Sequence, residues 1–294
     1  MTTQIELIGK YGLSVRGHLG QHLLIDPNYQ RKIVDLIHQA PDELIVEIGP
    51  GLGALTKPLL ERGAEVWAIE KDGRFVEVLE KEFGASGKLH VIHADVLDTD
   101  LSKVPPRAAR PVKLAGNLPY YITAPIFFHI LESRRHFSRA VVTIQKEVAD
   151  RFTAAPGTRE YGRLTLAMRY AADVRQAFDI PPSCFTPRPE VGSTTLVMDF
   201  HGDKQRLPKE KEKLLFEVIR IAFSQRRKTL LHILSHEKSV GLERAALEKI
   251  LAGAGLKEKV RGEELLLKDF MALAEALRAA GGLRKLRQAA GDAV

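Results

Sequence analysis

The sequence predicts an α/β protein in two parts: a doubly wound, mostly parallel β-sheet, followed by a small all-helical domain. Three observations lead to this fold class. The apolar run 44–48 breaks into glycines at positions 49, 51 and 53 and continues as an amphipathic helical pattern. Short apolar runs and helical patterns then alternate with short connections as far as residue 200. From residue 209 onward only helical periodicity remains.

The elements of the sheet follow one another in a regular order. Asp26 is suited to cap a first helix that begins at Pro27, because proline fits the first helical turn. Further helices are expected at 55–60, 75–83, 126–131, 146–152 and 164–171. Seven strands are expected at 44–48, 66–69, 89–92, 113–115, 140–145, 174–178 and 195–200. The segment 181–189 is too rich in proline for regular structure and is expected to form a stiff loop.

The domain boundaries follow from changes in composition. Residues 1–19 carry little periodicity and several glycines, so we expect a flexible arm at the start of a first domain that spans 1–202. The polar stretch 201–208 marks a linker, and a helical domain is expected at 203–280. Residues 281–294 are rich in alanine, glycine and basic side chains and are expected to be a disordered tail.

Composition limits the classes of protein. The 294 residues include 45% hydrophobic and 28% charged residues, which is ordinary for a soluble globular protein. We find no apolar run long enough to span a bilayer and no signal-peptide pattern, and the single cysteine, Cys184, fits a reducing compartment. We therefore expect a cytoplasmic protein without a membrane partner. The excess of positive charge lies in residues 203–294, which hold 20 basic and 13 acidic residues and so favour a phosphate-backbone partner.

The glycine turn after the first strand predicts a nucleotide site. Glycine lets the backbone turn sharply and approach a ligand more closely than any Cβ allows. Gly49, Gly51 and Ala54 match a dinucleotide fingerprint, with Glu70 at the offset of a ribose-binding acid. The same loop, with Glu47 two positions before the first glycine, also resembles the S-adenosylmethionine loop of class I methyltransferases. The loop alone leaves both cofactors open.

The ends of the first four strands converge on one crevice, because ligands in such sheets lie beyond the carboxyl ends of the strands. The glycine loop, Glu70, Asp95 and Asn117 each follow one of these strands. Asn117 begins the sequence Asn-Leu-Pro-Tyr, whose chemistry suits methylation of an exocyclic amine. The Asn oxygen accepts one amine hydrogen without adding charge, the proline stiffens the turn, and Tyr120 offers a flat face on which a purine can stack.

Together these motifs resemble the ribosomal RNA adenine dimethyltransferase family, with the bacterial KsgA type as the nearest member. The resemblance rests on residues 20–24, 47–53, 117–120 and 185–191, and extends to 145–148, 161–164, 223–230 and 261–265. It implies a Rossmann-like class I methyltransferase with a seven-stranded sheet. It also implies S-adenosylmethionine as methyl donor, S-adenosylhomocysteine as product, and no metal.

The resemblance also implies roles for individual residues. Tyr120 and Phe185 match the aromatic side chains that sandwich a flipped target adenine. The residues expected to form the reaction site are Asn117, Leu118, Pro119, Tyr120 and Phe185. Those expected to bind the donor are Gln21, His22, Leu24, Glu47, Gly49, Gly51, Glu70, Asp95, Val96 and Asn117. The family arm usually reads Gly-Gln-Asn-Phe-Leu, so His22 departs from the pattern and its role stays open.

The implied partner is small-subunit ribosomal RNA or a pre-ribosomal particle, in which the family methylates two adjacent adenines twice each. Arg226, Arg227 and Lys228 are expected to contact RNA phosphates, and the protein is expected to be a monomer. Within the family, the alternative is the Erm type, which modifies large-subunit RNA. Further alternatives are a non-catalytic RNA-binding relative and a dinucleotide oxidoreductase. His232 and His236 lack the glutamate partner of a known metal motif.

Overall fold

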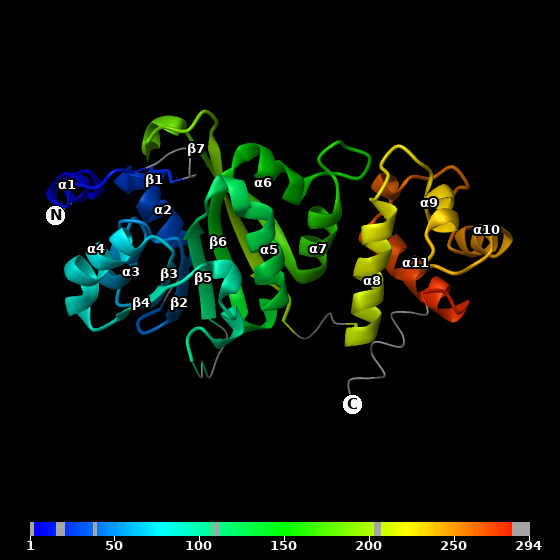
Figure 1. Ribbon diagram of the computed structural model, residues 1–294, viewed down its shortest axis with the longest axis horizontal. Coiled ribbons are helices and arrows are strands. Elements are labelled where there is room, and N and C mark those ends of the chain that lie inside the picture. The colour runs from blue at the N-terminus through cyan, green and yellow to red at the C-terminus, as the bar shows by residue number, and fades with distance from the viewer. Residues whose placement is uncertain are drawn as a thin grey trace. The chain divides into compact units, whose positions relative to one another are not determined.

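A computed structural model describes residues 3–15, 21–37, 40–106, 108, 112–202 and 207–283 (Figure 1). The chain divides into two compact units. The first contains the chain up to Thr153 and returns for Ala171–Gly202, and the second contains Ala154–Tyr170 and the chain after residue 202. Residues 154–170 therefore belong with the helical unit. The sequence predicted them in the first domain, because it predicted a single boundary at residue 202.

The first unit is built on a seven-stranded sheet, which confirms the predicted fold class. Its strand order is β4-β3-β2-β5-β6-β9-β7, and β9 is antiparallel to both of its neighbours while the other pairs run parallel. The strands are β2 (Leu44–Ile48), β3 (Glu65–Glu70), β4 (Leu89–His93), β5 (Val112–Asn117), β6 (Phe137–Gln145), β7 (Ala172–Ile180) and β9 (Ser193–Phe200).

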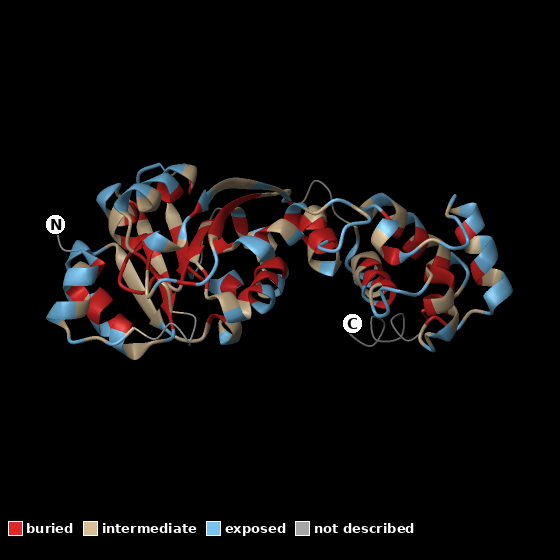
Figure 2. Ribbon diagram, turned by 90° about the horizontal axis from the view of Figure 1, so that it is seen from above, coloured by how far each residue is buried: buried red, intermediate tan, exposed pale blue. Residues whose placement is uncertain are grey.

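Helices flank the strands of the large sheet along the chain and bury their apolar faces. They are α2 (Pro27–Ile37), α3 (Thr56–Glu61), α4 (Gly73–Phe83), α5 (Thr123–Glu132) and α6 (Lys146–Thr153). The central strands read as continuous apolar runs because a parallel sheet is covered on both faces, and Ile45, Val66 and Leu114 are fully buried. Figure 2 shows the buried residues gathered on the strands and on the inner faces of the helices.

The N-terminal region is more ordered than the flexible arm expected from the sequence. Residues Gln4–Lys10 form helix α1, which begins at a capping box between Thr3 and Glu6. Leu7 is buried in an apolar cluster with Leu23, Leu52, Phe75 and Val78. Helix α1 is therefore packed against the glycine loop and helix α4. Residues 16–20, which include Gly20 of the family motif, lie outside the described residues.

A two-stranded sheet joins the arm to the proline-rich segment. Strand β1 (Leu23–Leu24) pairs antiparallel with β8 (Phe185–Thr186), so Leu23 faces Thr186 and Leu24 faces Phe185. The segment 181–189 is consequently not a loop throughout. The arm provides backbone partners for Phe185 and Thr186, which the sequence of the segment alone does not reveal. This pairing fixes the arm beside the end of the large sheet.

The second unit has its own apolar core. It contains α8 (Lys209–Ala222), α9 (Leu230–His236), α10 (Arg244–Gly253) and α11 (Leu267–Ala279), together with most of α7 (Arg163–Ala171). Tyr161 is fully buried in this core, and its hydroxyl donates to the Leu265 carbonyl oxygen at 2.7 Å. This contact explains why residues 154–170 belong to the helical unit. Among the described helices, none is both long and apolar enough to cross a membrane.

Candidate active site

A cavity of about 550 Å³ lies at the carboxyl ends of the central strands of the first unit. Its volume falls within the range of about 300–1,000 Å³ that small-molecule sites usually have. The cavity is lined by residues that follow four different strands. This agrees with the prediction that these strand ends converge on one crevice. The predicted site residues that line it are Gln21, His22, Gly49, Gly51, Glu70, Asp95, Val96, Asn117, Leu118, Pro119 and Tyr120.

The glycine loop forms one wall of the cavity. Gly49 and Gly51 adopt φ values of 64° and 56°, a region that L side chains rarely adopt. A Cβ on Gly51 would also lie 2.8 Å from the end of the Leu23 side chain, which would have to shift. The loop thereby leaves its backbone open to the cavity, as a bound nucleoside requires.

Glu70 lies at the end of β3 and is only 8% exposed. One carboxylate oxygen accepts from the Gly51 backbone N–H at 3.0 Å, and the other accepts from the Asp72 N–H at 2.8 Å. Burial raises the pKa of this carboxyl above its usual range, and the backbone donors oppose that effect. A carboxylate has about four lone-pair positions, so both oxygens keep the capacity to accept from ligand hydroxyls.

Asp95 stands beyond the end of β4, on the same side of the cavity. One of its oxygens accepts from the Leu97 N–H at 3.0 Å, and the other forms an ion pair with Lys71 at 2.7 Å. The Lys71 ammonium lowers the pKa of Asp95, so this carboxylate is ionised at neutral pH. Val96 follows it and begins a short 3₁₀ helix, which places both residues in the cavity wall.

Asn117 ends β5 with its side-chain amide held in one orientation. Its Nδ2 donates to the His22 carbonyl oxygen at 2.8 Å, and the opposite flip would set two oxygens against each other. Its Oδ1 is buried and has no hydrogen-bond partner among the described residues. A buried acceptor without a partner is energetically unfavourable, so a ligand donor that reaches this oxygen would satisfy it.

Backbone geometry fixes the position of Asn117. A Cβ on Gly116 would lie 2.8 Å from the Ile48 carbonyl oxygen, so β5 approaches β2 more closely than any other residue allows. On the far side, the Leu118 N–H donates to the Thr143 carbonyl oxygen at 3.0 Å. The amide is consequently mounted between two paired strands rather than on a free loop.

Tyr120 forms an aromatic wall beside that amide. Its hydroxyl and the Ser193 hydroxyl are 2.6 Å apart and share a hydrogen bond. Burial raises the pKa of the phenol, which keeps it neutral at physiological pH. The His22 imidazole stacks on the Tyr120 ring with centroids 5.2 Å apart and planes inclined by 26°.

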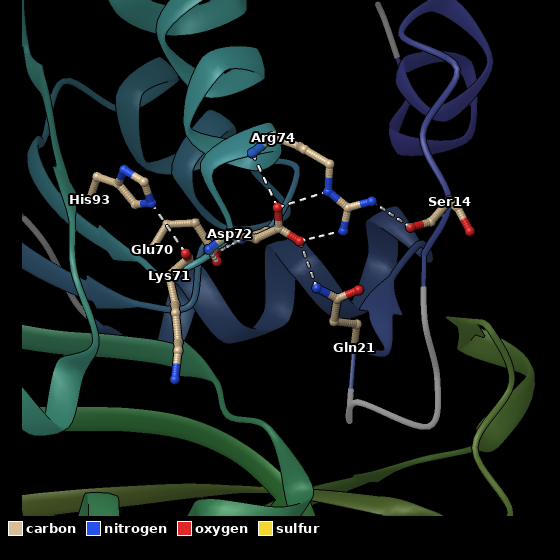
Figure 3. Close-up of polar contacts among 8 residues, drawn as sticks. Ser14, Gln21, Glu70, Lys71, Asp72, Arg74 and His93 are labelled. Carbon is tan, nitrogen blue, oxygen red and sulfur yellow. Dashed lines mark hydrogen bonds and ion pairs between the residues drawn. The ribbon is translucent and has the colours of Figure 1, made fainter.

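The arm is fastened to the loop after β3 by polar contacts (Figure 3). Asp72 caps helix α4 and accepts from the Gln21 amide at 2.9 Å and from the Arg74 Nε at 2.9 Å. Arg74 in turn donates to the Ser14 carbonyl oxygen at 3.3 Å. The Arg74 guanidinium holds the pKa of Asp72 at about 2. Sequence reasoning missed Asp72, although its place two residues after Glu70 and before a helical pattern was a usable signal.

Three predicted site residues lie outside the cavity lining. Glu47 is 1% exposed and accepts a hydrogen bond from the Thr56 hydroxyl at 2.6 Å behind the glycine loop. Leu24 is fully buried on β1, and its strand partner Phe185 is 3% exposed within the same apolar core. These residues support the cavity from behind. The contact roles expected for them from the sequence stay predictions.

The cavity also contains residues that the sequence did not single out. They are Leu23, Ile48, Ile69, Lys71, Asp72, Gly73, Phe75, Ala94, Tyr121, Ile122 and Ile126. Most are apolar neighbours of predicted residues, and their orientation depends on tertiary packing. Within the described ranges, no three His, Cys, Asp or Glu side chains group together as metal ligands.

The basic segment predicted to contact RNA lies in the second unit. Arg226 donates to the carbonyl oxygens of Arg159 at 2.6 Å and of Tyr161 at 3.2 Å, and it pairs with Glu263 at 3.1 Å. This guanidinium therefore holds the segment 154–162 against the helical core. Arg227 and Lys228 are exposed beside it.

The sheet order, the glycine loop and the acidic strand ends together define an α/β enzyme of the class I methyltransferase type. The sequence matches the family described as "Ribosomal RNA adenine dimethylase" over residues 12–273. The chain belongs to this family, which confirms the predicted resemblance. It is therefore an enzyme that methylates ribosomal RNA adenines, with S-adenosylmethionine as the methyl donor.

Individual relatives agree with this assignment. The chain is 39% identical over 272 residues to "Ribosomal RNA small subunit methyltransferase A" of Clostridium perfringens, covering 92% of this chain and 94% of the relative. It is 38% identical over 275 residues to the protein of that name from Halothermothrix orenii, covering 92% and 91%.

Two solved structures share the fold. One is a dimethyladenosine transferase from Plasmodium falciparum, with a TM-score of 0.73 at 24% identity, covering 89% of this chain and 100% of that one. The other is the 23S rRNA methyltransferase ErmE, with a TM-score of 0.67 at 21% identity, covering 87% and 99%. At these identities the likeness concerns the fold.

Proposed function

We propose that this protein transfers methyl groups from S-adenosylmethionine to the exocyclic N6 amines of two adjacent adenines in small-subunit ribosomal RNA. The observation that carries the proposal is the buried Asn117 Oδ1, an acceptor with no partner among the described residues and a fixed orientation. The names of the bacterial relatives support the small subunit as the substrate. We further propose that the protein acts as a cytoplasmic monomer on a pre-ribosomal particle.

The residues of the cavity suit the methyl donor. When bound, S-adenosylmethionine supplies an electrophilic methyl group. The Glu70 carboxylate has acceptor capacity for two ribose hydroxyls, and Asp95 offers an ionised carboxylate to an adenine amine. Gly49 and Gly51 line the cavity with backbone at positive φ. We assign donor binding to Gln21, His22, Gly49, Gly51, Glu70, Asp95, Val96 and Asn117.

The chemistry at the acceptor side is mainly positioning. An adenine amine has two hydrogens, and Asn117 Oδ1 accepts one of them, which turns the nitrogen lone pair in a defined direction. The backbone of Leu118 and Pro119 holds this geometry, and the neutral Tyr120 ring offers a stacking face. A strong general base is unnecessary, because the amine becomes acidic only after it has been methylated and then loses its proton to water.

The experiment that tests this proposal measures transfer of labelled methyl groups from S-adenosylmethionine. Undermethylated small-subunit particles, large-subunit RNA and a reaction without RNA are compared. Label in two adjacent small-subunit adenines is the expected result. Label confined to large-subunit RNA would assign the Erm-type activity instead, and donor binding without any transfer would point to a non-catalytic relative.

A further inference from the structure

One residue of the loop after β3 contacts both sides of the reaction site. Asp72 lines the cavity and forms the N-cap of helix α4. Its backbone N–H donates to the Glu70 carboxylate at 2.8 Å, on the side assigned to the methyl donor. Its own carboxylate accepts from the Gln21 side-chain amide at 2.9 Å, on the side of the arm. Asp72 therefore bridges the loop after β3 and the arm.

The Asp72 carboxylate is itself held in one orientation. Arg74 approaches it with two side-chain nitrogens, Nε at 2.9 Å from one oxygen and a terminal nitrogen at 2.5 Å from the other. A two-point contact between a guanidinium and a carboxylate fixes the relative orientation of the two groups. The Gln21 amide reaches the same carboxylate from a different side (Figure 3). The oxygen that accepts from Gln21 is therefore presented at a fixed place.

The residue after Gln21 contacts the amine-holding group directly. The backbone carbonyl oxygen of His22 accepts from Asn117 Nδ2 at 2.8 Å. This bond leaves the buried Asn117 Oδ1 as an acceptor without a partner among the described residues. The direction of that oxygen consequently depends on where the His22 carbonyl lies.

The His22 carbonyl is held from both directions along the chain. On its C-terminal side, Leu23 and Leu24 pair with β8. On its N-terminal side, Gln21 is bonded to Asp72. Because each residue has only two soft backbone dihedrals, contacts on both neighbours leave this carbonyl little freedom to turn.

We propose that Asp72 is a positioning residue for methyl transfer: through Gln21 and the peptide that follows it, Asp72 orients the Asn117 amide. This inference rests on the proposed function, because it concerns the group that holds the adenine amine. A misplacement of about 1 Å that originates far from the reacting atoms can cost about a hundredfold in rate. The role is one of orientation and needs no contact between Asp72 and the transferred methyl group.

Three variants separate this role from the structural duties of the loop. Asp72→Ser keeps a side chain that caps a helix, but its hydroxyl ends one bond short of the carboxylate oxygen that accepts from Gln21. Gln21→Ala removes the same contact from the arm. Lys10→Ala is the matched control, because it removes a different ion pair between the arm and α4, the one with Glu82, and leaves Asp72 in place.

The first readout is the single-turnover rate constant for methyl transfer to undermethylated small-subunit particles. Donor and particle are both saturating, so weaker binding of either does not contribute. We expect Asp72→Ser and Gln21→Ala each to lower this rate constant about tenfold, and Lys10→Ala to leave it within about twofold. The double variant Asp72→Ser, Gln21→Ala should be about as slow as the slower single variant, because both changes break the same contact.

The second readout observes Asn117 in the protein alone, without RNA or donor. The nuclear magnetic resonance signals of its side-chain amide are assigned by their loss in Asn117→Ala. These signals should shift in Asp72→Ser and in Gln21→Ala, and they should stay in place in Lys10→Ala. Circular dichroism checks the fold of each variant, and Gln21→Ala decides the test where Asp72→Ser does not fold.

An unchanged saturated rate constant in Asp72→Ser, with only a higher KM for the donor, would overturn the inference. Equal slowing by Lys10→Ala would also overturn it, because the effect would then belong to packing of the arm in general. Losses that multiply in the double variant would show that Asp72 does not act through Gln21. Failure of the natural chain to methylate any particle would refute the proposed function, whereas unshifted Asn117 signals would refute this inference.

Discussion

Replacing Glu47 by glutamine is predicted to change how stability depends on pH. The Glu47 carboxyl lies beneath the glycine loop, 1% exposed, and accepts a hydrogen bond from Thr56. Burial raises its pKa from the ordinary value of 4.5 to about 7, and the nearby Glu70 carboxylate adds to the effect. A glutamine side chain keeps an oxygen for the Thr56 hydroxyl and cannot ionise.

The sign follows from the two pKa values. Well below pH 4.5 the carboxyl is protonated in both the folded and the unfolded chain. As the pH rises, the unfolded chain ionises first, while the folded chain stays protonated until about pH 7, so ionisation favours unfolding. The separation of the two pKa values corresponds to about 3 kcal/mol of stability, which is lost across this window.

Urea unfolding at a series of pH values from 4.5 to 8 measures the effect. Trp67, the single tryptophan, lies on β3 and reports unfolding of the first unit. The free energy of unfolding of Glu47→Gln minus that of the natural chain should rise by about 3 kcal/mol up to pH 7 and then level off. The Glu47 and Glu70 carboxylates repel each other, so the difference reports the ionisation of residue 47 together with its coupling to Glu70. A difference that does not vary with pH would refute the account of a buried, protonatable carboxyl.

Three further predictions concern catalysis, packing and RNA contact. Asn117→Ala should lower the rate constant for methyl transfer at least about a hundredfold, because one positioned hydrogen bond is lost. Circular dichroism should show an intact fold. Near-normal turnover would reject the role of Asn117 in holding the amine. Gly116→Ala should lower the melting temperature and weaken product binding, since its Cβ would lie 2.8 Å from a backbone carbonyl oxygen of β2; unchanged values would mean that the strands can separate at no cost. The double variant Arg227→Ala, Lys228→Ala should flatten the salt dependence of RNA affinity. Arg226→Ala should mainly lower the melting temperature of the helical unit. The reverse pattern would show that Arg226 is the residue that contacts RNA.

The strand order and the strand-end site residues could be predicted because they depend on local signals. Continuous apolar runs mark buried parallel strands, and the glycine spacing of the loop requires a turn with positive φ. The topology of such sheets then brings Glu70, Asp95 and Asn117 to one edge. The first two steps use only residues that are neighbours in the sequence, and the last uses the general topology of such sheets.

The remaining features depend on contacts between distant segments. Phe185 faces the core because β8 pairs with β1, and neither two-residue strand has a pattern of its own. Glu47 points behind the loop toward Thr56, a direction that alternation along one buried strand does not reveal. The segment 154–170 joins the helical unit because Tyr161 finds its partner near Leu265, about a hundred residues later in the chain.

The central claim is that the buried amide of Asn117 presents an adenine amine of small-subunit RNA to a methyl donor. Mapping labelled methyl groups in undermethylated small-subunit particles after reaction with the natural chain and with Asn117→Ala tests it most directly. The account predicts label on the N6 atoms of two adjacent adenines with the natural chain and a loss of that label with the variant. Equal label with both proteins, or label only in large-subunit RNA, would contradict it.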